Sequence, residues 1–398
     1  MLFKRSYHYF IMAIITLLTI SCIEEIEFET ETFESALVIE ATITNEMKLQ
    51  EIVLSRTFRF EEDGPVPETG ASVAVLNNGA TISFSETEPG IYRSDSPFAA
   101  LPNTDYQLSI TANNGRSYSS TTTQLTNISQ IDELYAMRET NDDGINGMSI
   151  YVDSFDPTGN SKYYRYEYEE TYKIVAPRYV NQDLIITEPD SCLVALVDRP
   201  PGQRVCYNTV SSINLNLINT NAFSEDRVSQ HLIRFIDSED FIISYRYSIL
   251  AKQYIQSREA YTYFETLNEF TGEGSLFSQT QPGFFNGNIS SDSNSDEKVI
   301  GFFDVSSVST KRLYFNYDDF YNNEPLPPYA SACSEVAPEQ FTLGVCGSLI
   351  NDLLNNRVKY LALNENPQQE EGPYLVVPRA CGDCTALGSS TVPDFWEE

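Results

Sequence analysis

The first part of the chain alternates between apolar and polar residues with a period of two. Turn-forming clusters such as Asn77-Asn78-Gly79 and Glu88-Pro89-Gly90 separate the alternating runs. Such runs are typical of short strands with one buried face. The pattern therefore predicts an immunoglobulin-like (carboxypeptidase-regulatory-like) β-sandwich domain over residues 36–126. The runs that carry the prediction are Leu37–Ile43, Ile52–Arg56, Ser72–Leu76, Ile82–Phe84, Gly90–Tyr92 and Tyr106–Ala112.

A second, larger β-rich domain is expected over residues 127–398. Its predicted strands are Ser149–Asp153, Tyr163–Tyr172, Phe241–Leu250 and Arg312–Tyr317. One stretch, Ser257–Phe270, has apolar residues near helical spacing and begins with a serine, a favoured N-cap residue. We therefore predict a mainly β chain with one or two short helices.

The N-terminus has the order of features that secretory signals require. Lys4 and Arg5 precede an apolar run over residues 10–18, and small residues then lead to Cys22. The run is shorter than the ~18 residues that a membrane-spanning helix needs. It resembles bacterial lipoprotein signals, which are cut before a lipidated cysteine, although Thr19 stands where leucine is usual. We predict a signal peptide over residues 1–21 and lipidation of Cys22; the alternative is a plain signal peptide with a stray cysteine.

Residues 22–35 are predicted to form an acidic tether between the lipid and the first domain. Residues 23–34 carry six glutamates and no basic residue. In Bacteroidetes surface lipoproteins, an acidic cluster directly after the lipidated cysteine marks export to the outer face of the outer membrane, and Glu24 and Glu25 resemble that signal. This predicts a lipid-anchored protein that faces the cell exterior. The alternatives are a flexible charged leader and exposure to the periplasm.

The excess of acidic residues disfavours negatively charged partners. The chain has 57 acidic and 25 basic residues and a formal net charge of −32. A field of this sign repels phosphate backbones and anionic lipid headgroups. We therefore expect no nucleic-acid partner, and we expect the lipid rather than electrostatics to hold the protein on the membrane.

Six cysteines follow Cys22, and their even number in an exported chain predicts disulfides. We favour a Cys192–Cys206 bridge across the turn at Pro200-Pro201-Gly202 and expect the other four to pair among themselves. The six candidates are Cys192, Cys206, Cys333, Cys346, Cys381 and Cys384.

Two other interpretations apply to the last four of these cysteines. Cys381 and Cys384 have the spacing of a thioredoxin motif, but a Gly/Ser-rich stretch follows them in place of a helix. A zinc site is the other alternative, and an oxidising compartment disfavours it. The single tryptophan, Trp396, is expected to anchor the C-terminus in a core rather than to stack on a ligand.

Few residues offer catalytic or metal-binding chemistry. Beyond the signal the only histidine is His231, which we expect at an exposed strand position. Nothing like a Gly-x-Ser-x-Gly motif surrounds a serine. Two stretches, 139–144 and 292–296, have the alternating oxygen ligands of calcium loops, but each departs from the full motif. We predict polar loops there and expect no catalytic residue, metal or cofactor.

Several stretches resemble one family. Residues 282–312 combine a Gly-Asn-Ile element with the strand Gly-Phe-Phe-Asp-Val-Ser-Ser-Val-Ser, and residues 378–396 read PRACGDCTALGSSTVPDFW. Both resemble a Bacteroidetes outer-membrane lipoprotein family catalogued as domain of unknown function four-two-four-nine. The resemblance implies a lipoprotein encoded near TonB-dependent receptors, with no established catalytic residues.

We therefore predict a non-catalytic binding and docking accessory of a TonB-dependent β-barrel receptor. The 25 tyrosines suit a recognition surface for a small ligand, a glycan or a peptide. The alternatives are an extracytoplasmic hydrolase that uses loop carboxylates and a purely architectural envelope protein.

Overall fold

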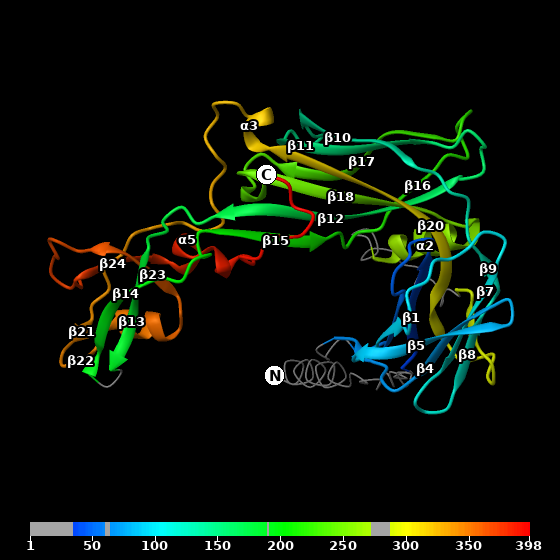
Figure 1. The fold of residues 1–398 in the computed structure, drawn as a ribbon, viewed down its shortest axis with the longest axis horizontal. Coiled ribbons are helices and arrows are strands. Elements are labelled where there is room, and N and C mark those ends of the chain that lie inside the picture. The colour runs from blue at the N-terminus through cyan, green and yellow to red at the C-terminus, as the bar shows by residue number, and fades with distance from the viewer. Residues whose placement is uncertain (1–34, 60–63, 189–190, 272–286) are drawn as a thin grey trace, which may run out of the picture.

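The computed structural model describes residues 35–59, 64–188, 191–271 and 287–398. The protein is mainly β, as predicted, and forms an arch in which a central part carries two limbs on the same side (Figure 1). Cys22, Glu24 and Glu25 lie outside the described residues, so lipidation and the surface-export signal stay predictions. No helix in the described ranges is long and apolar enough to cross a bilayer.

The N-terminal limb, defined as residues 35–126 and 287–306, is one strongly curled sheet around a core of its own. Neighbouring strands follow the order β20-β1-β2-β6-β5-β4-β7-β8-β19, with β3 and β9 at the side. Its immunoglobulin-like class stays a prediction. The strands are β1 (Leu37–Thr44), β2 (Glu51–Arg56), β3 (Val66–Pro67), β4 (Ser72–Asn77), β5 (Ala80–Glu88), β6 (Ile91–Ser94), β7 (Asp105–Thr111), β8 (Ser117–Ser120), β9 (Thr123–Gln124), β19 (Ile289–Ser291) and the first half of β20 (Val299–Asn316).

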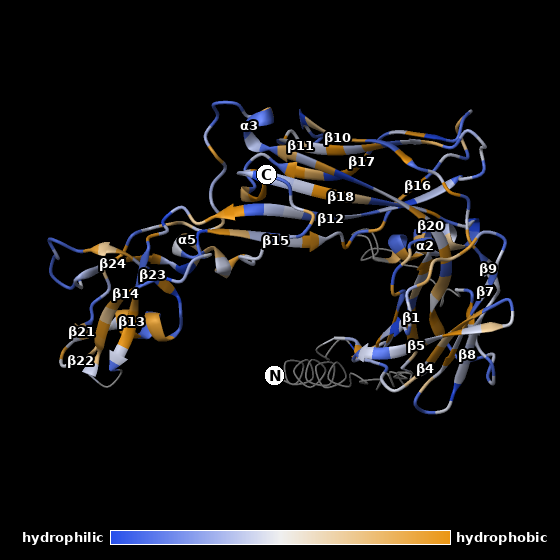
Figure 2. Cartoon of the chain, in the orientation of Figure 1, coloured by the Kyte–Doolittle hydropathy of each residue, from blue (hydrophilic) through white to orange (hydrophobic). Residues whose placement is uncertain are grey.

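Apolar residues of the alternating sequence pattern lie on the buried face of these strands, and the polar residues between them lie on the outer face. In β7, Tyr106, Leu108 and Ile110 are completely buried, whereas the residues between them are partly exposed. The same change of apolar and polar residues runs along the strands in Figure 2. Burial of such aliphatic or aromatic side chains stabilises a fold by about 1.5–3 kcal/mol each, so this face fixes the register of the strand.

The central part packs two sheets face to face around the largest core. A three-stranded sheet, β10-β11-β17, covers a second sheet in the order β15-β12-β18-β20. The strands are β10 (Ile131–Thr140), β11 (Asn146–Phe155), β12 (Tyr163–Val175), β15 (Val205–Ser211), β16 (Asn216–Asn219), β17 (Arg227–Asp237) and β18 (Arg246–Ile255), and the helix α3 (Tyr317–Phe320) follows β20.

One predicted strand is partly wrong. Residues 241–243 form a short 3₁₀ turn, and β18 begins only at Arg246. The carboxylate of Asp240 accepts the Ile242 backbone N–H at 3.1 Å and so caps this turn. The run of apolar residues continues through both elements, and for that reason the pattern does not show the break.

The second limb, here called the stapled limb because disulfides join its segments, extends from the other end of the central part. It combines residues 176–204 with residues 325–388. Its elements are β13 (Gln182–Glu188), β14 (Leu193–Asp198), β21 (Phe341–Thr342), β22 (Val345–Cys346), α4 (Ser348–Leu354), β23 (Val358–Leu363), β24 (Tyr374–Pro378), α5 (Arg379–Gly382) and a 3₁₀ turn at Cys384–Ala386.

Strand β20 belongs to both the N-terminal limb and the central part. Residues 299–306 pair with β1 in parallel, Ile39 opposite Gly301, and residues 307–316 pair with β18 antiparallel. The predicted domain boundary between residues 126 and 127 therefore does not separate the two parts completely, because residues 289–306 pair with strands of the first sheet. At the crossing, the hydroxyl of Thr126 donates to the Ile255 carbonyl at 2.7 Å and accepts the Ser307 N–H at 2.8 Å.

Asp304, beside this crossing, gives the stability of the protein a defined pH dependence. Its side chain is completely buried and accepts the Ser306 hydroxyl. Burial raises its pKa above the usual value, although the Ser306 hydroxyl and the Arg165 charge act in the opposite direction. The folded state therefore holds this proton more tightly than the unfolded state, and stability from this group is lost as pH rises from the unfolded pKa through the folded pKa.

We expect Asp304→Asn to raise the melting temperature at pH 7 by a few degrees, because the amide keeps the shape without the buried charge. The gain should shrink as pH falls and vanish below the unfolded aspartate pKa of about 4. Thermal melts of both proteins between pH 4 and pH 8 test this. A constant difference across that range would contradict the assignment to titration of Asp304.

Candidate binding groove

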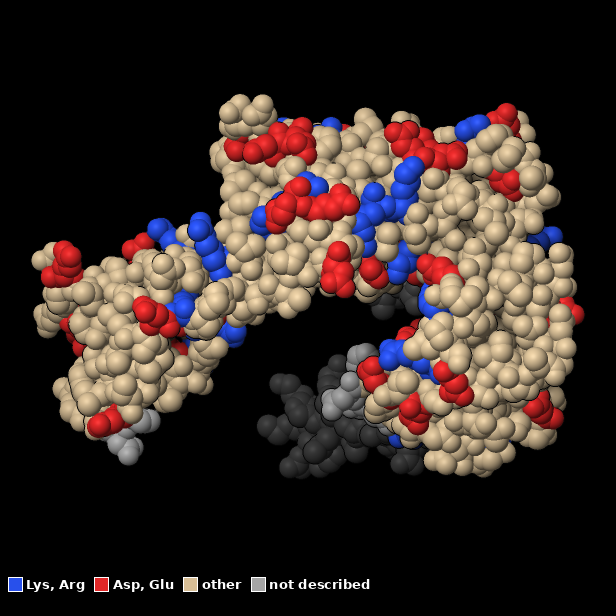
Figure 3. Space-filling view, viewed as in Figure 1, with Lys and Arg blue, Asp and Glu red and all other residues tan. Residues whose placement is uncertain are grey.

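An open groove of about 1040 Å³ lies where the N-terminal limb meets β12, helix α2 (Arg258–Thr271) and the loop after β15. Its floor is the outer face of β1, β2 and β20. In these strands every second side chain enters the core of the limb, which leaves the others outside. Val38, Val53 and Ile300 make this floor apolar, and Figure 3 shows the hollow between the two limbs.

Helix α2 forms one wall, and it confirms the helix that the sequence predicts. The Ser257 hydroxyl accepts the Ala260 N–H at 3.0 Å, which is the expected N-cap contact. Tyr263 packs on Phe302 of β20 with ring centroids 5.4 Å apart. Burial raises the pKa of Tyr263 to about 12, and the charge of Glu40 adds to this shift. The phenol therefore stays protonated at neutral pH.

A clamped arginine closes the end of the groove. Arg165 and Glu167 lie two residues apart on β12, so their side chains share a face and form an ion pair. The Arg165 guanidinium also lies 4.3 Å from the ring centroid of Tyr254 and 4.9 Å from that of Phe264. Its side chain is only 8% exposed. These contacts fix one cation in place with little freedom to move.

The remaining lining leaves the groove with a small excess of carboxylates, since among the described lining residues Glu40, Glu51 and Glu167 outnumber the one cation, Arg165. Glu40 is exposed on the floor, and Glu51 forms a 2.8 Å ion pair with Arg93. On the opposite side the loop after β15 contributes Ile213, which is 94% exposed. Apolar surface with surrounding carboxylates favours a ligand that has an apolar body and neutral or cationic polar groups, and it disfavours phosphates.

All six cysteines beyond Cys22 form disulfides, as predicted, but the favoured Cys192–Cys206 pair is wrong. The bridges are Cys192–Cys346, Cys206–Cys384 and Cys333–Cys381. The turn at residues 200–202 does not bring Cys192 and Cys206 together, because β14 lies in the stapled limb while β15 pairs with β12 in the central part. Since Cys381 and Cys384 bond to different partners, they form neither a redox pair nor thiolate zinc ligands.

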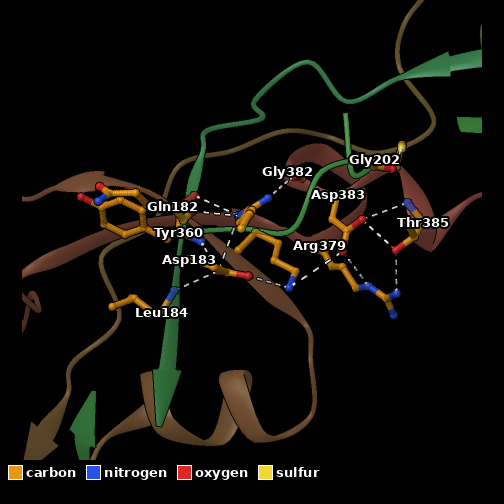
Figure 4. Close-up of polar contacts among 12 residues, drawn as sticks. Gln182, Asp183, Leu184, Gly202, Tyr360, Arg379, Gly382, Asp383 and Thr385 are labelled. Atoms are coloured by element: carbon orange, nitrogen blue, oxygen red, sulfur yellow. Dashed lines mark hydrogen bonds and ion pairs between the residues drawn. The ribbon is translucent and has the colours of Figure 1, made fainter. Parts of the chain in front are cut away.

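A charge cluster, missed by the sequence analysis, holds the stapled limb together (Figure 4). The side chain of Arg199 is 1% exposed and donates to the carbonyls of Gln182, at 2.9 Å, and Gly382. Lys359 lies 2.7 Å from Asp183 and 3.8 Å from Asp383. These contacts join β13, β23 and the segment after β24. Because the side chains of Arg199 and Lys359 already bind backbone carbonyls and carboxylates, we interpret the cluster as a structural clamp.

His231 and Trp396 have structural surroundings. His231 lies on β17, but it is partly buried against Tyr166, so the expected exposed position is wrong. Burial lowers its pKa to about 4, and its Nε2 contacts the Asn216 Oδ1 at 2.6 Å. Trp396 packs on Tyr207 with ring centroids 4.9 Å apart and thereby fixes the C-terminal segment to β15. Trp396 therefore anchors the C-terminus as predicted, but its ring is half-buried against Tyr207 and Tyr314 and does not lie inside a core.

The two calcium-like stretches form polar loops. In the β10–β11 hairpin the Asn141 side chain accepts the backbone N–H groups of Asp143, at 3.1 Å, and Ile145, at 2.9 Å. Asn294 accepts the Asp296 N–H at 3.1 Å in the same way. Among the described residues no group of three or more His, Cys, Asp or Glu side chains lies close enough to hold a metal ion.

Comparisons with known proteins give a family and weak structural neighbours. No protein with curated annotation matches the chain. The adhesin InvE of Yersinia pseudotuberculosis is 13% identical, with 55% of this chain and 54% of that chain covered and a TM-score of 0.14. The BSP domain of a biofilm associated protein is 11% identical, with 71% and 59% covered and a TM-score of 0.14. The chain thus spans little more than half of either neighbour.

The family match is of a different kind, because it follows the chain through both sheets that β20 connects. The model of the family described as Domain of unknown function (DUF4249) matches residues 23–312, from the predicted tether to the second half of β20. That range is well over half of the sequence. The chain therefore belongs to this family.

Proposed function

We propose that the protein is a lipid-anchored outer-membrane protein that faces the cell exterior and acts as a non-catalytic binding and docking accessory of a TonB-dependent β-barrel receptor. The observation that carries the proposal is the groove, which has an apolar floor, an aromatic wall and a small excess of carboxylates. A ligand with an apolar body would bury its surface there. The lipid on Cys22 and the acidic pair Glu24 and Glu25 supply the location.

The charged groups of the groove support binding rather than turnover. Arg165 is held by Glu167 and two rings, Glu51 is held by Arg93, and Tyr263 keeps its proton at neutral pH. Groups that are fixed in this way give orientation and specificity. The ligand remains one of the classes predicted above, a small molecule, a glycan or a peptide, with the excess of carboxylates favouring those that carry a positive group.

Gentle detergent extraction of the tagged protein from native membranes, followed by mass spectrometry, tests the docking part. We expect a stoichiometric TonB-dependent barrel in the extract and a diacylglycerol-modified Cys22. A Cys22→Ala variant is the control, since it should lose both the lipid and the membrane fraction. If the lipidated protein came out alone, the docking proposal would fail.

The groove itself is tested with Val53→Arg, which places a long cation on its floor. The matched control is Leu76→Arg on β4, a 38% exposed strand position that does not line the groove. Native mass spectrometry of protein isolated from its own membranes should show a bound molecule in the wild type and in the Leu76→Arg variant, and little of it in Val53→Arg. Equal retention by all three proteins would remove the groove from the proposal.

A further inference from the structure

The free end of the stapled limb presents three exposed apolar residues on one hairpin. Strands β21 and β22 form a hairpin whose turn is Leu343-Gly344. The side chains of Phe341, Leu343 and Val345 have relative exposures of 52%, 101% and 65%. We call these three residues the hairpin tip. Large apolar side chains that gather on one small protrusion are a mark of an interaction site.

The backbone conformation of the tip also indicates an interaction site. Leu343 has φ 48° and Gly344 has φ 84°, so both central residues of this two-residue turn lie in the left-handed region. Turns of this kind favour Asn-Gly, because a leucine there is sterically disfavoured. The protein therefore holds a fully exposed leucine in a conformation that is unfavourable for it. Such local strain is typical of functional positions.

The hairpin is fixed rigidly to the limb. The Cys192–Cys346 disulfide joins the end of β22 to the start of β14. The Gln340 side chain donates to the Cys192 carbonyl at 2.9 Å, and the Gly347 N–H donates to the Gln340 carbonyl at 2.8 Å. A tip that is already ordered loses little entropy when it binds.

The arch directs this tip toward the same side as the predicted tether. Strand β1 begins at Leu37, opposite Val299, and its other end, Thr44, lies at the crossing to the central part. The chain thus enters at the free end of the N-terminal limb. Figure 1 shows that both limbs extend from the same side of the central part, with β21 and β22 at the free end of the stapled limb. From Cys22 to Ser35 the extended chain can reach at most about 45 Å.

We propose that the hairpin tip inserts into the lipid surface to which the tether fastens the protein, and so forms a second contact with the membrane. The proposal rests on the lipid anchor of the proposed function. Residues 340–350, QFTLGVCGSLI, carry no charged side chain, although the whole chain has a net charge of −32. The neighbouring residue Glu339 lies at the base of the hairpin, away from its turn, and its carboxylate accepts the Thr342 hydroxyl. Apolar side chains gain free energy when they are buried at the boundary between the headgroups and the acyl chains. Insertion that is strong enough to hold the lipid-free chain on vesicles would also fix the orientation of the arch in the tethered protein.

Vesicle flotation of the mature chain from residue 23, which lacks the lipid, tests the proposal. The probe is uncharged vesicles of phosphatidylcholine and phosphatidylethanolamine. We expect the wild type to float with them, and we expect Leu343→Asn/Val345→Thr to lower the partition coefficient about tenfold, given the apolar area removed. Asparagine suits the left-handed turn position, so this variant should keep its fold. Its melting temperature is the check.

Met47→Asn is the matched control. Met47 is 73% exposed in the loop after β1, at the crossing end of that strand, and should float like the wild type. A wild type that stays with the unbound protein, or a double variant that floats equally well, would overturn the proposal. A tip that binds only a barrel gives the first of these results. Because the assay needs neither the lipid nor a barrel, its failure is distinct from failure of the docking proposal.

Discussion

Gly301→Ala is expected to destabilise the protein by about 3 kcal/mol or more, because two separate costs meet at this position. Gly301 has φ 149°, where residues other than glycine are strained. An added Cβ would also lie 2.3 Å from the Ile39 carbonyl oxygen and 2.9 Å from the Ile39 Cβ. Both atoms belong to the paired strand β1, so the parallel pairing itself would have to shift. Thermal and urea unfolding of the two proteins measure the loss.

Gly64→Ala separates the two costs. Gly64 has φ 137°, and an added Cβ there would meet no atom of the described residues within 4 Å. The free energy of unfolding of this control should fall only by the cost of the backbone conformation, about 1 kcal/mol. If Gly301→Ala were no more destabilising than Gly64→Ala, the contact between β1 and β20 would have to be looser than the structure shows.

Removal of the Cys206–Cys384 disulfide should have the other large effect. The two cysteines are 178 residues apart in the sequence, although the other two bridges shorten the path between them, and both are completely buried. Loop-closure entropy gives an upper value of about 5 kcal/mol for a loop of this size, and measured losses for native disulfides are about 2–5 kcal/mol. We therefore expect Cys206→Ala/Cys384→Ala to unfold at a clearly lower urea concentration. The fluorescence of Trp396 reports it, because this ring packs on Tyr207, next to Cys206.

The control for this prediction is Cys192→Ala/Cys346→Ala, which removes a bridge of similar sequence separation, 154 residues, at the free end of the stapled limb. Trp396 lies at the central part, so its unfolding midpoint should change less in this variant. Equal shifts in the two double variants would mean that the limb and the central part unfold as one unit.

Local order could be predicted from the sequence, and long-range pairing could not. The alternation in Tyr106–Ala112 and the serine before α2 reflect forces within a few residues, and the structure confirms both elements. The parallel pairing of β1 with β20 leaves no such trace, because each strand is apolar on its buried face whichever neighbour it has. The predicted Cys192–Cys206 pairing was wrong for the same reason. Cysteines that are close in the sequence lie in different parts of the fold, and the sequence does not show this.

The groove was beyond prediction because no single stretch of sequence contains it. Its lining comes from six distant segments, near Val38, Val53, Arg165, Leu215, Phe264 and Ile300. By itself each looks like an ordinary strand, loop or helix surface. Arg165 in particular belongs to the predicted strand Tyr163–Tyr172, in which charged residues alternate with tyrosines, yet its side chain is buried beside the rings of Tyr254 and Phe264.

The shared strand β20 also sets the order in which the protein can fold. Strand β1 is among the first segments to be synthesised, but its parallel partner, residues 299–306, is made only after the central part. Such pairing between distant segments slows folding. Until then β1 and β8 remain open edges that can pair with other chains. A fragment that ends at residue 126 should therefore aggregate. In the nascent chain the open edges of β1 and β8 have to be kept from pairing with other chains until residue 306 has been synthesised.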